Sequence, residues 1–358
     1  MTVLHARPYA PKRGPPDGHL AGESSAVAVN ITRFHNVFLY QSHSPVPELL
    51  RDLGMLGRLD ARAEKQLGAL TTAAWLTTIP GGSLILLCCY ASWASAVSSD
   101  VPFSWQGAQP LKNGFLLGLL LLAVGGLFFL WRAMLKPRDL DNRRYGLARV
   151  LLQRLQVDLA PDAPVRLKLD LRQPDVREKR VRQDMVGWWR TEFFVDPWLT
   201  LEARLADGTF LRIRMVEKHQ KRERYKTSAS GKTKKKSKRK GFARLEVSLR
   251  VKPERHPRLG TLKGQTTNAT RLPPRVQLER VRVAADRLSL RVRLAGDWVA
   301  RAQKAPEDPE TPAFWKEALE KDDASRTATM MLLSLYQVVR YARRRGKQRA
   351  AWARRQSV

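Results

Sequence analysis

Residues 113–131 read NGFLLGLLLLAVGGLFFLW, and no charged side chain lies between Lys112 and Arg132. A helix needs about 20 apolar residues to cross the hydrocarbon core of a bilayer, whereas apolar runs of about 10 to 14 residues are typical of helices buried in a soluble core. We therefore expect a membrane span at about 113–132. A helical hairpin buried inside a soluble protein is the alternative.

A second charge-free run lies upstream, between Lys65 and Asp100. It is longer but more polar at its start, and two glycines follow Pro80. We place its lipid-crossing part at about 75–97 and expect a kink at Pro80, because proline removes a helical hydrogen bond. The run begins too late in the chain for a cleaved signal peptide. The sequence thus predicts a transmembrane hairpin over 70–135.

The basic residues beside the spans predict their orientation. Four occur in 51–65 and five in 132–144, whereas the segment between the spans holds only Asp100 and Lys112. Lysine and arginine are enriched in cytoplasmic flanks, so we expect an integral protein of the plasma or inner membrane with both termini cytoplasmic. Aromatic side chains anchor spans at the interfaces, and the candidate anchors are Trp75, Trp93, Trp105 and Trp131.

Small residues recur within the second span, where Gly114 and Gly118 are followed by Gly125 and Gly126. Small residues let helices approach closely in lipid. Packing of the two spans against each other is the plainer interpretation, and a homodimer contact is the alternative. Neither span holds Asp, Glu, Lys or Arg, which argues against transport, because ion and proton pathways normally use such groups.

The positive charge of the chain is concentrated after the spans. The 358 residues carry a formal net charge of +32, and residues 136–358 hold 55 basic and 26 acidic residues. The tract 218–240 contains 12 basic residues and one acid, Glu223. The tract 340–355 contains 8 basic residues and no acid. With the predicted orientation, both tracts lie on the cytoplasmic side, where the nearest polyanion is the inner leaflet.

Apolar and polar residues alternate strictly in the C-terminal half, which predicts strands with one buried face. A phase change at Glu279–Arg280 indicates a bulge. We expect an α+β membrane protein whose cytosolic domain is a mainly antiparallel sheet or sandwich, with the basic tract as a long hairpin. The predicted strands are 165–172, 199–205, 211–215, 245–251, 276–283 and 287–294.

Helices are expected on either side of this β region. An amphipathic helix is indicated at 49–67, another at 145–157 and a third at 324–345, and Thr311-Pro312 marks a further helix start. The third helix either covers the sheet or lies on the inner membrane surface with its apolar face down. A short strand is expected within 31–40.

These observations define five regions. They are a disordered segment at 1–30, a cytosolic segment at 31–69, the hairpin at 70–135, a β-rich domain at 136–321 with a basic loop at 218–240, and a C-terminal helix with a basic tail at 322–358.

No motif for catalysis, metal binding or a cofactor is found, so no such residue is predicted. An aromatic cluster, Trp188 to Trp198, is either core or an interface surface. We expect a membrane-anchored binding or scaffold module, with a membrane-tethered enzyme or a nucleic-acid-binding membrane protein as alternatives. The preferred contact is with anionic lipid headgroups, then an acidic protein, then nucleic acid. The candidate contact residues are Lys221, Arg222, Arg224, Lys232, Lys234, Lys235, Lys236, Lys238, Arg239, Lys240, Arg343, Arg344 and Arg345.

Overall fold

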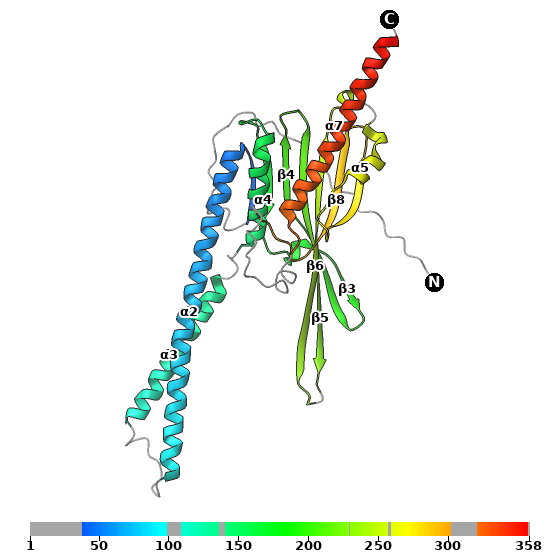
Figure 1. Cartoon of the computed structure of the whole chain (residues 1–358). Coiled ribbons are helices and arrows are strands. Elements are labelled where there is room, and N and C mark those ends of the chain that lie inside the picture. Colours follow the sequence, from blue (N-terminus) through cyan, green and yellow to red (C-terminus); the bar gives the residue numbers. More distant parts are fainter. Residues whose placement is uncertain are drawn as a thin grey trace, which may run out of the picture.

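The computed structural model describes residues 38–98, 109–135, 140–228, 230–256, 259–301 and 321–356. It is an α+β structure with one antiparallel sheet and two long apolar helices that could span a membrane (Figure 1). The segment 1–30, the predicted helix start at Thr311-Pro312 and the candidate anchor Trp105 lie outside the described residues.

Within the described residues, eight strands form a single sheet in the order β1-β2-β4-β5-β6-β8-β7, with β3 paired to β4 beside this path. The predicted alternatives were a sheet or a sandwich, and the structure has the sheet. Every pairing between these strands is antiparallel, including that of β1 with β2, which are far apart in the sequence. The bounds are β1 Leu39–Ser44, β2 Val165–Asp170, β3 Arg180–Val186, β4 Trp189–Arg204, β5 Phe210–Thr227, β6 Thr233–Arg250, β7 Gln277–Val283 and β8 Arg287–Ala295.

The alternation in the sequence places apolar side chains on one face of this sheet. Leu167, Leu201, Ile213, Val247 and Leu290 are all buried in one continuous core. The predicted bulge is confirmed, since the register between β7 and β8 shifts between Leu278 and Arg280.

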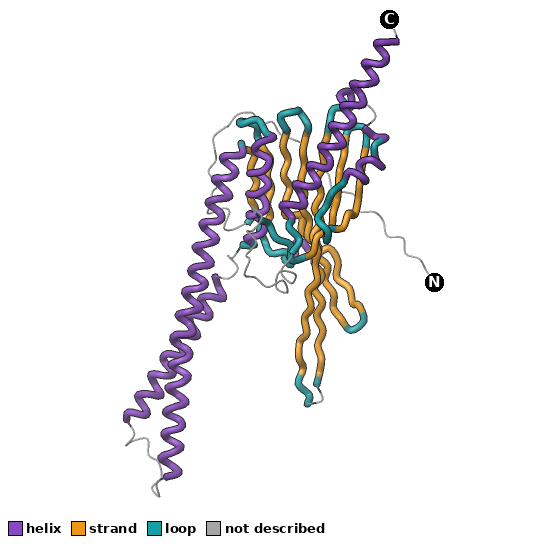
Figure 2. Tube along the Cα trace, viewed as in Figure 1, coloured by secondary structure: helices purple, strands orange, loops and turns teal. Residues whose placement is uncertain are grey.

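Three helices pack near the apolar side of the sheet (Figure 2): α4 Asn142–Leu155, α5 Lys263–Ala269 and α7 Ala324–Gln356. Leu147 of α4 and Met331 and Leu335 of α7 are buried in the same cluster as the strand residues. The predicted helices at 145–157 and 324–345 are thus present, the second with a longer C-terminal end.

The long helices are α2 Val46–Ser98 and α3 Gln109–Leu135. The first part of α2 lies beside α4, and its later part runs below the sheet alongside α3 (Figure 1). The helix α2 continues without a break through Pro80, and the amphipathic helix expected at 49–67 is its first part. Only 17% of the most apolar stretch of α2 and 11% of that of α3 is buried. Most of their apolar surface therefore has no protein cover among the described residues.

Glycines line the contact between α2 and α3. A Cβ atom added at Gly118 would lie 2.7 Å from Cγ1 of Ile85 and 3.0 Å from the carbonyl oxygen of Gly81. At Gly125 it would lie 2.4 Å from Oγ1 of Thr78. These small residues thus pack the two helices of one chain together, which is the plainer of the two interpretations. Gly126 faces open space.

Polar contacts fix the first part of α2 to the β domain. The backbone N–H of Leu140 donates to Oδ1 of Asp60 at 3.1 Å, and the hydroxyl of Tyr145 donates to Oδ2 of the same carboxylate at 2.9 Å. The hydroxyl of Tyr40 in β1 donates to Asp52 at 2.8 Å. Because α2 is one continuous helix, these contacts set the direction of the apolar hairpin relative to the sheet.

Candidate functional surface

A long hairpin of β5 and β6 extends beyond the sheet. The pairing continues without a shift from Phe210↔Arg250 to Thr227↔Thr233. The turn that closes it includes Gly231, whose φ of +75° is readily adopted by glycine. The predicted hairpin is therefore confirmed, although 218–240 is mostly paired strand rather than loop. We call residues 218–240 the basic hairpin.

The basic hairpin projects from the sheet in the same general direction as α2 and α3 (Figure 1). Its ten candidate contact residues are thereby brought onto one projection. Lys221, Arg222 and Arg224 of β5 are partly buried, and the candidate residues that follow the turn are exposed. The exposed ones are Lys232, Lys234, Lys235, Lys236, Lys238, Arg239 and Lys240.

Most of this charge has no carboxylate partner within the described residues. Glu223 pairs with Lys235 at 3.0 Å and with Lys221 at 3.4 Å. The hydrogen bond from Lys235 lowers the pKa of Glu223 from its ordinary value. Arg239 reaches Asp175 at 3.1 Å. The remaining cations of the hairpin form a surface that favours a polyanionic partner.

A second, shorter hairpin, formed by β3 and β4, projects beside the first (Figures 1 and 2). Val186 pairs with Trp189, so Gly187 and Trp188 form a two-residue turn, and Gly187 has the positive φ of +58° that such turns require. Trp188 is 87% exposed, and Met185 and Val186, which come just before the turn, are also exposed. We call Met185, Val186 and Trp188 the apolar tip.

Trp189 links the two hairpins. The guanidinium carbon of Arg224 lies 4.4 Å from the centre of a Trp189 ring, and Nζ of Lys238 lies 5.8 Å from it. The structure divides the predicted aromatic cluster, because Phe194 and Trp198 are buried in the protein whereas Trp188 is not. Phe194 and Trp198 are therefore core residues, whereas contact of the exposed Trp188 with a partner or a bilayer stays a prediction.

A buried network of ion pairs lies where both hairpins leave the sheet. Arg144, in the first turn of α4, is only 1% exposed, and its Nη2 lies 2.7 Å from both Oδ2 of Asp196 and Oε2 of Glu217. Nζ of Lys179 lies 2.8 Å from Asp196 and 3.2 Å from Asp170. The network joins α4, which follows the apolar hairpin, to β2, β4 and β5.

Two tryptophans complete this network. The Trp198 and Trp298 rings stack with centres 5.7 Å apart and an angle of 4° between their planes. Nε1 of Trp298 donates to Oε1 of Glu217 at 2.9 Å, and the Arg144 guanidinium carbon lies 5.3 Å from the centre of the Trp198 ring. These contacts hold the bases of β4 and β5 in one arrangement.

The charges of the network respond differently to burial. Burial raises the pKa of Asp196, and Arg144 and Lys179 only partly oppose this effect. Burial also acts to raise the pKa of Glu217, but the contacts from His219, Arg144 and Trp298 outweigh it and hold that pKa at about 2. Because its carboxylates are enclosed and bound by cations, the network is suited to structural coupling rather than to contact with a ligand.

The candidate contact arginines of α7 do not lie near the basic hairpin. Arg343, Arg344 and Arg345 are exposed near the end of α7 that points away from both hairpins (Figure 1). The structure therefore does not bring them together with the basic hairpin. The tryptophans Trp75, Trp93 and Trp131 are exposed on α2 and α3, and Trp75 meets Phe129 edge to face with ring centres 5.5 Å apart.

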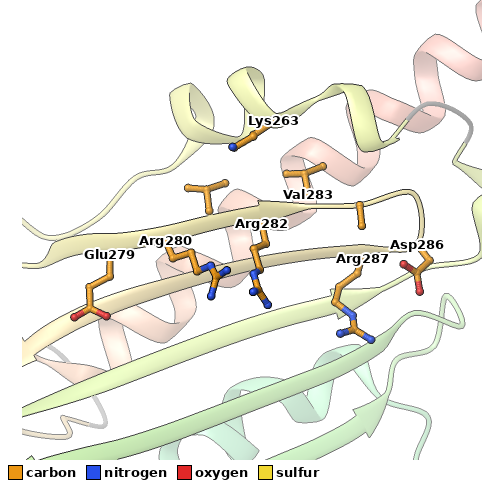
Figure 3. Close-up of a pocket in the computed structure, with 9 residues that line it drawn as sticks. Lys263, Glu279, Arg280, Arg282, Val283, Asp286 and Arg287 are labelled. Carbon is orange, nitrogen blue, oxygen red and sulfur yellow. The ribbon is translucent and has the colours of Figure 1, made fainter. Parts of the chain in front are cut away.

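An open recess of about 860 Å³ lies along β7 and β8, where Arg280, Arg282 and Arg287 extend to the same side of the strands (Figure 3). Its two carboxylates are engaged by other arginines, Glu279 by Arg244 at 2.8 Å and Asp286 by Arg250 at 3.1 Å. The recess is therefore basic and holds no nucleophile paired with a base. Among the described residues, no three His, Cys, Asp or Glu side chains converge to hold a metal ion.

Comparisons with known proteins found no match for this chain among protein-family models, curated proteins or solved structures. Its function is therefore argued from the residues described above.

Proposed function

We propose that the protein is a membrane-anchored binding or scaffold module, with α2 and α3 as its transmembrane hairpin. The basic hairpin then contacts the anionic headgroups of the inner leaflet. The observation that carries this proposal is that the apolar hairpin and the basic hairpin project on the same side of the β domain (Figure 1).

The exposed apolar surface of α2 and α3 supports a lipid environment. Leu86, Leu120 and Leu127 are each at least 60% exposed, and they belong to continuous apolar helix faces. Soluble proteins rarely expose contiguous apolar patches larger than a few hundred Å². A core helix of a soluble protein would be mostly buried, so the alternative of a buried soluble hairpin has little support in the burial of α2 and α3.

The charged residues that flank the spans support a cytoplasmic location for the β domain. Lys65 and Arg132 bracket the apolar runs at the end nearest the β domain, as cytoplasmic flanks do. The cytoplasmic leaflet carries most of the anionic lipid, and each Lys or Arg near it contributes about 1 kcal/mol. The exposed cations of the basic hairpin are therefore sufficient for a stable, salt-dependent contact.

The length of the basic hairpin indicates how it meets the leaflet. Strands rise about 3.3 Å per residue, so Thr227 lies roughly 33 Å beyond Glu217 along β5. Lys65 lies only about 8 Å beyond Asp60 along α2. Polar strands do not enter hydrocarbon. The spans and the hairpin diverge in Figure 1, and a span tilt within the usual range of up to about 40° lets the hairpin meet the headgroups obliquely.

Helix α7 is assigned in this proposal to the sheet and not to the membrane surface. Its apolar residues Met331 and Leu335 are buried with strand residues, which leaves no free apolar face at those positions to lie on lipid. Its terminal arginines face away from the leaflet that the basic hairpin contacts.

The test places a fluorophore on the basic hairpin in a defined bilayer. The full chain, with Cys88 and Cys89 replaced by alanine, receives one cysteine by Lys236→Cys and is labelled with NBD in nanodiscs. We expect its emission to shift to the blue as phosphatidylglycerol replaces phosphatidylcholine, and the shift to reverse at high salt.

The matched control is Ala206→Cys, an exposed position at a turn on the opposite end of the sheet. An equal response at positions 206 and 236, or no response to anionic lipid at 236, contradicts the leaflet contact. In the second case an acidic protein becomes the preferred partner of the basic hairpin.

A further inference from the structure

We propose that the apolar tip of the β3–β4 hairpin inserts into the interface of the same leaflet and forms an apolar anchor separate from the basic hairpin. This inference rests on the proposed membrane location of α2 and α3. It assigns to the tip a lipid contact that depends on apolar burial rather than on the sign of the headgroup charge.

The exposure of the tip is the first observation. Trp188 is 87% exposed, Met185 is 69% exposed and Val186 is 46% exposed, at the end of a hairpin whose pairing is continuous from Arg182↔Phe193 to Val186↔Trp189. Large aromatic side chains bury 150–250 Å² when they are covered, which is worth several kcal/mol. An indole at the end of a projecting turn is thus placed where a partner, and not the protein itself, covers it.

The second observation is how far the apolar tip reaches along the basic hairpin. Arg190 pairs with Glu223, which places Trp188 beside the last part of β5 and roughly 10 Å short of the turn of the basic hairpin. The contacts of Trp189 with Arg224 and Lys238 hold the two hairpins together. Because both hairpins project on the same side of the β domain as α2 and α3, a bilayer around these spans that reaches the basic hairpin also lies close to Trp188.

The chemistry of the tip favours a bilayer. Tryptophan concentrates at the membrane–water interface, where its ring is buried and its N–H remains solvated. Arg182 and Arg190 flank the apolar side chains of the tip and extend from the same two strands. Cations around an apolar insertion reach the phosphates while the apolar groups enter the acyl boundary.

A protein partner fits the tip less well. A specific protein interface covers about 800 Å² on each side. The apolar tip has three projecting side chains at the end of a two-stranded ribbon, and charged residues lie beside it. Such a narrow projection matches a fluid surface that closes around it better than it matches a flat protein surface.

The inserted tip would fix the β domain at a third point. The spans and the basic hairpin supply the other two, and the buried network around Arg144 connects the base of the hairpins to α4. The spans on one side and the two adjacent hairpins on the other hold the sheet at one angle to the membrane.

The experiment uses the full chain without its native cysteines, labelled with NBD at Trp188→Cys, in nanodiscs of phosphatidylcholine with or without a lipid spin-labelled high on its acyl chain. We expect quenching at position 188 to be about twofold or more that at the control Ala206→Cys, because only the tip lies in the interface. Met185→Cys is a second site on the tip, should the loss of the tryptophan disturb the turn.

A further label at Leu120→Cys separates this inference from the proposed function. Strong quenching at 120 with equal, weak quenching at 185, 188 and 206 would overturn the inserted tip and leave the transmembrane hairpin in place. Weak quenching at 120 as well would overturn the membrane location itself. Quenching at 188 that occurs only with anionic lipid would also overturn the inference, since the tip would then merely follow the basic hairpin.

Discussion

Replacing Arg144 by methionine should destabilise the β domain far more than the same change at Arg143. Arg144 is almost fully buried and contacts two carboxylates at 2.7 Å, together with the carbonyl oxygen of Asp170 at 2.9 Å. Arg143 is 38% exposed at its side chain, pairs with Asp141 at 2.8 Å and donates to the carbonyl oxygen of Gly296 at 3.2 Å. The two residues are adjacent in α4 and share a side-chain length, so they form a matched pair.

The expected losses of stability differ because the two arginines differ in burial. Removing one partner of a buried ion pair costs about 3–5 kcal/mol, because the carboxylates of Asp196 and Glu217 are left without their shared cation. The partly exposed Arg143–Asp141 pair contributes about 0–1 kcal/mol, and the hydrogen bond from Arg143 to Gly296 contributes about 1 kcal/mol. For a domain of about 200 residues, each kcal/mol lowers Tm by about 2–4 °C, so Arg144→Met should lower Tm by roughly 6–20 °C and Arg143→Met by at most about 8 °C.

The assay is thermal unfolding of the full chain in detergent at one fixed heating rate, followed by circular dichroism in the β-sheet region. Arg144→Lys is expected to lie between the wild type and Arg144→Met, because a single ammonium cannot reproduce the planar donor set of a guanidinium. Equal shifts for the methionine variants at 143 and 144 would refute the idea that Arg144 holds the bases of the hairpins.

Three further predictions concern the spans, the pH response and the tryptophans. Gly118→Leu should disrupt the α2–α3 contact and raise the protease sensitivity of the hairpin, whereas Gly126→Leu should be tolerated because open space lies beside it; equal sensitivity would contradict the packing. The pKa of Glu217 is about 2 when folded, below its ordinary value of 4.5, so its stabilisation is present above about pH 4.5 and is lost as pH falls towards 2. Asp196, with its raised pKa, acts in the opposite direction, and Glu217→Gln should remove part of the fall in Tm between pH 5 and pH 2; an unchanged fall would exclude Glu217 as its source. Trp198→Ala should cost about 3–5 kcal/mol and Trp188→Ala close to none in denaturant unfolding, since only the first leaves a cavity; similar costs would show that Trp188 is not exposed.

The elements with a strong local pattern could be predicted from the sequence. Apolar and polar residues alternate in β2, β5, β6 and β8, and α3 contains a long run without charge. Each pattern extends over enough residues to indicate only one kind of secondary structure. The basic tract could be placed as a hairpin because strands of opposite direction flank it. The sequence could not predict that β5 and β6 stay paired as far as Thr227 and Thr233. A run of lysines has low strand propensity, and here the register is set by the parts of β5 and β6 that lie within the sheet.

The buried network was missed because its members lie far apart in the sequence. Arg144 was counted only as a flanking charge for topology. One signal was available: Leu211, Ile213 and Met215 face inward, and Glu217 continues their phase into the core. A carboxylate at an inward position requires a buried cation. Identifying Arg144 as that cation requires the position of α4, which no local pattern supplies.

The separation of the two basic tracts also depends on tertiary structure. Sequence reasoning grouped Arg343, Arg344 and Arg345 with the lysines of 218–240 because both tracts follow the spans. The direction of α7 across the sheet places these arginines at the opposite end (Figure 1). Their contact with lipid stays a prediction from charge alone, and the structural argument applies only to the basic hairpin.

The most direct test of the central claim is the labelling of single cysteines in intact cells with a membrane-impermeant maleimide. The chain without Cys88 and Cys89 carries one cysteine at Gln109, the first residue of α3, or at Ala206 or Lys236 in the β domain. We predict labelling at position 109 in intact cells, and labelling at positions 206 and 236 only after the cells are permeabilised. Labelling of 206 or 236 in intact cells, or protection of all three positions until permeabilisation, would contradict a transmembrane hairpin with the basic hairpin at the inner leaflet.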